Sequence, residues 1–135
     1  RENFLGKFDP LVLAIGGDQT QHLLWRLQHG ELLPLVANDE YATFVVLIGT
    51  NNIGSGSLPE PTSRGVTAVA EYILQNTKGR LLLLRLLPRG DSFRLERLCP
   101  PRCDVSGKPF QSFMPAINKV NKAIQAAVLD QMNGF

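Results

Sequence analysis

The sequence lacks any apolar run close to the about 20 residues that a membrane-spanning helix needs, and its first residues show no signal-peptide pattern. It has only two cysteines and two histidines, and aromatic residues make up 7% of the chain. The net charge is +2, and the basic residues are scattered instead of forming one stripe with aromatics between them, which argues against a nucleic-acid partner. We therefore expect a soluble intracellular protein with no membrane span.

The size and composition of the chain favour a single globular unit. Its 135 residues can bury one core but not two, and 44% of them are hydrophobic while 19% are charged. The first residue is Arg1 rather than methionine. We therefore expect residues 1–135 to be one domain, or part of one, within a longer or processed polypeptide.

The stretch Thr43 to Asn52 organises the expected fold. The apolar run Phe44–Ile48 is rich in β-branched residues and is typical of a buried strand in a parallel sheet. It breaks into Gly49-Thr50-Asn51-Asn52, at the carboxyl edge where open α/β sheets bind ligands. The alternative for these four residues is an ordinary turn, since glycine and asparagine are common turn residues.

A second strand and a helix are expected before it. The run Leu11–Ile15 reads as a short buried strand that ends at Gly16-Gly17. Asp18 can cap the following helix together with Gln21, and Gly30 is the expected stop. The predicted unit is a strand, a glycine turn and a helix.

The rest of the chain continues the alternation. The pattern predicts a helix from Pro61 to before Gly79, a strand over Arg80–Leu87, a long loop over Asp91–Ser112, and a helix from Phe113 to about Asn133. Three strands that alternate with three helices indicate an α/β fold with a parallel sheet.

Two of the strand ends carry groups that suit acyl transfer. The Gly17 N–H and the Asn51 side-chain amide could both donate hydrogen bonds to one developing oxyanion. The motifs that surround them are Gly16-Gly17-Asp18-Gln19-Thr20-Gln21-His22-Leu23-Leu24-Trp25-Arg26-Leu27, Gly30-Glu31-Leu32, Gly49-Thr50-Asn51-Asn52 and Leu86-Leu87-Pro88-Arg89-Gly90. In their order and spacing these motifs resemble those of the SGNH (GDSL-type) hydrolases, and within that family those of the catalytic subunits of intracellular platelet-activating-factor acetylhydrolase.

The resemblance implies a three-layer, flavodoxin-like parallel sheet that is incomplete in this chain. The three predicted strands correspond to the family's second, third and fourth, Gly17 to its oxyanion glycine, and Asn51 to its oxyanion asparagine. The family's Gly-Asp-Ser block, which follows its first strand, and its Asp-x-x-His pair near the end have no counterpart at those places in the sequence. The family's first strand lies between its second and third, so we expect another segment of the same polypeptide, or another chain, to fill the gap between Leu11–Ile15 and Phe44–Ile48.

No other residues supply a nucleophile and base, a metal site or a cofactor site. His22 and His29 both lie on the helix after Gly17 and read as solvated histidines, and Ser55, Ser57, Ser63, Ser92, Ser106 and Ser112 lie in loops or at helix starts. Cys99 and Cys103 could form a local disulfide or half of a metal site, but free thiols are favoured in a reducing compartment. A nucleotide-binding site at Gly16-Gly17 is disfavoured because no third glycine completes the fingerprint.

Two functions stay open. In the first, the chain is a segment of an SGNH-type serine esterase that acts on acyl or acetyl esters, contributing the oxyanion donors but no nucleophile or base, and is inactive by itself. In the second, it is a catalytically silent SGNH-like module that serves as an accessory or structural subunit of a larger assembly. Fold analogy does not choose between them.

Overall fold

The fold combines helices with a small parallel sheet. The computed structural model describes residues 10–91 and 93–133. Along the chain it contains α2 (Thr20–Arg26), the π-helical turn η1 (Leu27–Glu31), α3 (Pro34–Ala37), β1 (Thr43–Val46), α4 (Thr50–Gly54), α5 (Pro59–Asn76), β2 (Arg80–Leu83), α6 (Phe93–Leu98) and α7 (Met114–Asn133).

The sheet consists of β1 and β2, which pair in parallel with Thr43 opposite Arg80 and Val46 opposite Leu83. Helix α5 connects them, as expected for parallel neighbours. The predicted strands Phe44–Ile48 and Arg80–Leu87 are thus present but shorter than predicted. Beyond β2 the chain stays attached to the core because the Asn121 side chain accepts from the Leu86 N–H at 2.8 Å and donates to the Leu86 carbonyl at 3.0 Å.

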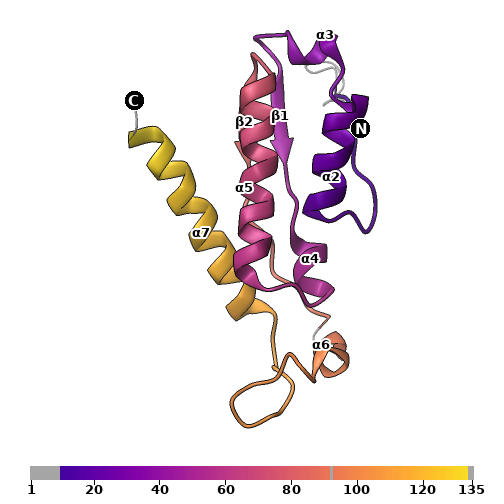
Figure 1. Cartoon of the computed structure of the whole chain (residues 1–135), viewed down its shortest axis with the longest axis vertical. Coiled ribbons are helices and arrows are strands. Elements are labelled where there is room, and N and C mark those ends of the chain that lie inside the picture. The colour runs from indigo at the N-terminus through magenta and orange to yellow at the C-terminus, as the bar shows by residue number, and fades with distance from the viewer. Residues whose placement is uncertain (1–9, 92, 134–135) are drawn as a thin grey trace, which may run out of the picture.

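The long helices cover one face of this sheet. Figure 1 shows α5 in front of β2 and beside β1, with α2 on one side of it and α7 on the other. The periodicity that predicted α5 and α7 marks the buried side of each helix, and α5 begins two residues before the predicted Pro61. The core is formed by Leu27, Val46, Ile48, Ile53, Val66, Val69, Ile73, Leu86, Leu95, Phe113, Ile117, Val120 and Ile124.

The opposite face of the sheet is exposed. Alternate strand residues point to opposite faces, and here Val45 is 59% exposed, Leu47 44% and Leu82 50%. Neither strand has a further strand partner among the described residues, so each has one free edge. This open apolar face, together with those edges, marks a surface that the described part of the chain leaves uncovered.

The prediction of a buried strand over Leu11–Ile15 is wrong. These residues are irregular, and all of them are exposed, with Val12 at 78%. An apolar run becomes a strand only where a neighbouring strand can accept and donate its backbone hydrogen bonds. The described residues provide no such neighbour, so the sequence pattern alone does not produce the strand.

The helix after Gly17 begins differently from its prediction. Gln19, not Asp18, is its N-cap, in a reciprocal pair with His22, because the Asp18 carboxylate instead accepts a hydrogen bond from Arg26. The same guanidinium also binds Glu31, so one arginine ties both ends of the α2 and η1 segment together. Gly30 has φ 101°, a conformation that suits glycine at a helix end, as the sequence predicted.

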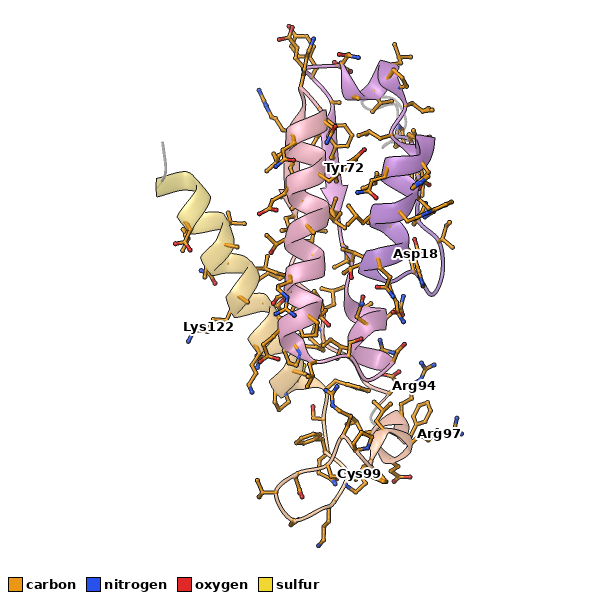
Figure 2. All side chains as sticks on the ribbon, viewed as in Figure 1. Asp18, Tyr72, Arg94, Arg97, Cys99 and Lys122 are labelled. Carbon is orange, nitrogen blue, oxygen red and sulfur yellow. A yellow bond between two sulfur atoms is a disulfide. The ribbon has the colours of Figure 1, made fainter. Side chains whose placement is uncertain are left out.

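The long loop over Asp91–Ser112 contains structure that the sequence did not reveal. Helix α6 lies within it, and Cys99 forms a disulfide with Cys103. The preference for free thiols is therefore wrong for this structure, since four positions of separation let the two sulfurs meet across one turn of loop. Figure 2 shows Cys99 beside the loop and Arg94 and Arg97 on α6. Among the described residues, no helix is both long enough and apolar enough to cross a membrane.

Candidate functional site

The site is a junction of two turns, residues 17–21 and residues 49–55, which we call the two-turn junction. The first turn leads into α2, and the second follows β1 and includes α4. Gly17 has φ 87° and Gly49 has φ 111°, both in the left-handed region that favours glycine. A Cβ on Gly49 would also lie 3.1 Å from a Val66 methyl and 3.2 Å from a Thr62 methyl, so this turn sits directly on α5.

The structure places Asn51 beside the turn that contains Gly17. The Asn51 Nδ2 donates a hydrogen bond to the carbonyl of Asp18, the residue after Gly17, at 2.8 Å. Across the described residues the Gly17 N–H donates no hydrogen bond. A carboxamide has two hydrogens, and the described residues accept only one from Asn51. Each of these two donors thus has hydrogen-bonding capacity to spare among the described residues.

Asn52 holds the two parts of the junction together through buried hydrogen bonds. Its side chain is 6% exposed and accepts a hydrogen bond from the Thr20 N–H at 3.0 Å. Its Nδ2 donates to the Thr20 Oγ1 at 3.3 Å and to the Gln21 Oε1 at 3.2 Å. Buried polar groups persist where they are paired in this way. Asn52 therefore holds the first turn of α2 onto α4.

Sequence reasoning singled out Asn51 and missed Asn52. The signal was present in the Asn51-Asn52 doublet, because adjacent residues at the start of a helix point in different directions. One can face the ligand side while the other faces the protein. Nothing in a single sequence says which of the two is buried, because their partners Asp18 and Thr20 lie more than thirty positions away.

The histidines and serines of the described chain do not assemble into a catalytic pair. The Nδ1 of His22 accepts from the Gln19 N–H at 3.3 Å, and His29 stacks on Trp25 with ring centroids 4.3 Å apart. Ser55 accepts from the Gln19 Nε2 at 3.0 Å. No serine is hydrogen-bonded to a histidine within residues 10–91 and 93–133, and Ser92 lies outside the described residues.

A hollow of about 350 Å³ lies on the Asn52 side of the junction, between α2 and α5. Neither Gly17 nor Asn51 lines it, so it is separate from the two candidate donors. Its lining residues are Thr20, Gln21, Leu24, Asn52, Ser57, Pro61, Thr62 and Gly65. The polar groups of Thr20 and Asn52 are already bonded to each other, which leaves this hollow with little to offer a ligand.

The described residues hold no metal-ligating cluster. No group of three or more histidine, cysteine, aspartate or glutamate side chains converges there, and both cysteines are engaged in the disulfide. The half metal site that the cysteine spacing allowed is therefore not formed by the described chain. The junction offers neutral hydrogen-bond donors instead.

Comparison with known proteins identifies relatives of one kind. No family model matches the chain. The chain is 41% identical over 88 residues to the platelet-activating factor acetylhydrolase IB subunit alpha2 of Gallus gallus, a match that covers 62% of this chain and 36% of that protein. It is 40% identical over 87 residues to subunit alpha1 of Bos taurus and 38% identical over 88 residues to subunit alpha2 of Homo sapiens.

The chain thus spans about 36% of the length of the curated relatives that it matches. The resemblance inferred from the glycine and asparagine motifs is confirmed. Over 62% of its length, this chain is similar to the alpha subunits of platelet-activating factor acetylhydrolase IB.

Proposed function

We propose that the two-turn junction is the oxyanion-binding part of an SGNH-type esterase, with the Gly17 N–H and the Asn51 Nδ2 as the two donors. The observation that carries the proposal is the 2.8 Å hydrogen bond from Asn51 to the Asp18 carbonyl, which brings the asparagine to the glycine turn. The similarity to subunits named acetylhydrolases supports ester hydrolysis as the reaction class. The substrate class that follows from it is a small acyl or acetyl ester.

The chemistry assigns these residues one task. A serine oxygen attacks the ester carbonyl, the carbonyl oxygen becomes negatively charged, and donors already in place stabilise that charge without reorganisation. Gly17 and Asn51 are suited to this task because both are neutral donors held on turns with fixed backbones. In this proposal the serine and its base come from a segment outside residues 1–135.

The 135-residue chain alone should therefore hydrolyse no ester above the solution rate, because oxyanion donors without a nucleophile and base give only weak residual catalysis. The measurement is turnover of a short-chain aryl ester by the purified chain, with the protein purified from its natural source as the comparison. Turnover by the 135-residue chain that a serine-directed phosphonate abolishes would contradict the proposal.

The second candidate is a catalytically silent accessory subunit. The observation in its favour is that the Asp18 carbonyl already occupies one hydrogen of the Asn51 amide. The natural protein decides between the two: phosphonate-sensitive turnover favours the esterase, and its absence in a folded natural protein favours the silent subunit. An intracellular location stays a prediction, and the Cys99–Cys103 disulfide is more typical of an oxidising compartment.

We further propose that a strand from outside residues 1–135 adds to β1, supplied by the same polypeptide or by another chain. The free edge of β1 and the exposed Val45 and Leu47 support this, as does the absence of pairing between Leu11–Ile15 and β1 among the described residues. If Leu11–Ile15 had paired directly with β1, no added strand could have fitted between them. The flavodoxin-like strand order implied by the family resemblance depends on this addition.

Hydrogen exchange tests the strand addition. Backbone amides of residues 43–47 should exchange more slowly in the natural protein than in the 135-residue chain, because an added strand accepts and donates their hydrogen bonds. Amides of α5 near Val69 serve as the internal control, since this helix is buried in both. Equal exchange of residues 43–47 in the two proteins would contradict the added strand, and mass spectrometry under denaturing conditions tells one longer chain from two.

A further inference from the structure

Arg89 reaches from the loop after β2 to the second turn of the two-turn junction. Its Nη1 donates to the Thr50 carbonyl at 2.6 Å and lies 3.2 Å from the Thr50 Oγ1, across 39 positions of sequence. Only 14% of its side chain is exposed. Thr50 is the residue directly before Asn51, so the arginine binds the peptide group that joins these two residues.

The guanidinium is held on its other sides as well. Its Nε and Nη2 donate to the two carboxylate oxygens of Asp91 at 2.7 and 2.6 Å, the two-point geometry in which arginine is most firmly oriented. Its charge lies 5.3 Å from the centre of the Phe113 ring, within the range of a cation–π contact. The hydrogen bond to Arg89 holds the pKa of Asp91 below its ordinary value. The pair therefore stays ionised at neutral pH.

Gly54 provides the space in which the guanidinium lies. A Cβ on Gly54 would be 2.5 Å from the Arg89 Nη1 and 2.6 Å from its Cζ. The arginine thus lies against bare backbone at the end of α4, while its Nη1 binds a carbonyl at the start of the same helix. Both ends of this five-residue helix contact one side chain.

A helix of this length is not stable by itself, because nucleation costs more than one turn of hydrogen bonds returns. The orientation of α4, and with it the direction in which Asn51 points, must be fixed by contacts from outside. Asn52 supplies one such contact toward α2. The charge-assisted bond from Arg89 to Thr50 supplies another, and it acts on the peptide next to Asn51.

We propose that Arg89 is a positioning residue that sets the direction of the Asn51 amide, with Asp91 orienting Arg89 in turn. The proposal rests on the proposed function of Asn51 as an oxyanion donor for its catalytic meaning. Its structural content, an arginine that fixes one asparagine side chain, is independent of that function. The loop after β2 and the turn after β1 are thereby coupled.

The test observes the Asn51 side chain directly in the 135-residue chain. Arg89→Met should shift the Asn51 side-chain NH₂ signals in ¹⁵N NMR spectra and raise their solvent exchange by roughly tenfold or more, because the anchored peptide becomes free to turn. The methyl signals of Val69 and Val120, which are fully buried in the core, should stay unchanged. Arg89→Lys, which can still reach the Thr50 carbonyl with one donor, should recover part of the effect.

Arg94→Met is the matched control. Arg94 also binds Asp91, at 3.1 Å, but it is 53% exposed and does not contact Thr50. The Arg94→Met substitution should leave the Asn51 side-chain NMR signals unchanged. Unchanged Asn51 signals in Arg89→Met, or equal changes in both arginine variants, would overturn the assignment.

A second variant covers the case in which Arg89→Met unfolds the chain. Gly54→Ala displaces the guanidinium by its added methyl group and keeps both charges, so it should produce the same Asn51 changes. Unchanged Asn51 signals in a folded Gly54→Ala chain would count equally against the proposal. In an esterase-active natural protein, Arg89→Lys should lower kcat with little change in KM. If Asn51→Ala leaves kcat unaltered there, the oxyanion proposal fails while the NMR result still decides the role of Arg89.

Discussion

Replacing Asn51 by alanine in an esterase-active protein that contains this segment should lower kcat by roughly 10²–10³-fold, the usual cost of removing one oxyanion donor. The loss should fall on kcat more than on KM, because the donor binds charge that develops only in the transition state. Folding should change little, since Asn51 has one hydrogen bond to the Asp18 carbonyl and a typical bond contributes about 0.5–1.5 kcal/mol.

Asn51→Asp provides the sharper form of the same experiment. It keeps the size of the side chain but replaces the NH₂ by a carboxylate oxygen, which repels an oxyanion, so the loss of kcat should be at least as large. Initial rates over a range of ester concentrations give kcat and KM, and denaturant titration gives stability. Near-normal kcat in folded Asn51→Ala protein would mean that Asn51 is a turn residue only.

Replacing the neighbouring Asn52 by alanine should act mainly on stability, unlike the Asn51 substitution, which acts on kcat. It should lower the free energy of unfolding by about 2–3 kcal/mol. The buried Thr20 N–H would lose its acceptor, and a buried donor left unpaired costs about 1–3 kcal/mol, to which the lost side-chain volume adds. Because Asn52 joins α2 to α4, the first turn of α2 should also lose its hydrogen-exchange protection. Chemical denaturation of the 135-residue chain measures the effect.

Asn118→Ala is the matched control for Asn52. Asn118 lies on the exposed surface of α7, so the same substitution there should change the free energy of unfolding by no more than about 0.5 kcal/mol. Equal effects of the two substitutions would show that the Asn52 hydrogen bonds contribute nothing that water does not replace.

Long periodic elements were predictable from the sequence. Helices α5 and α7 have apolar residues at helical spacing over 18 and 20 residues, so each predicts its own buried face. The parallel relation of the two strands follows from the helix between them. The motif spacing also predicted that Gly17 and Asn51 act on one oxyanion; the structure places Asn51 on Asp18, the residue after Gly17, and the shared role stays a prediction.

The remaining features depend on contacts that a local pattern does not contain. Helices α4 and α6 have five and six residues and are held by tertiary partners, so no periodicity could mark them. The run Leu11–Ile15 has the composition of a strand but no described neighbour to pair with. Arg89 reads as an ordinary loop arginine, because its partner Thr50 lies 39 positions earlier.

The bare side of the β1–β2 sheet has a consequence for how the isolated chain behaves at high concentration. Two short apolar strands with unpaired edges can template the addition of strands from other molecules, the route by which many proteins aggregate. Charged residues stand before each strand, Asp39 and Glu40 ahead of β1 and Lys78 and Arg80 at β2, in the manner of gatekeepers that slow such growth. Where two copies meet through like strands, β1 with β1 or β2 with β2, these charges repel each other, and salt that screens them would favour such self-association.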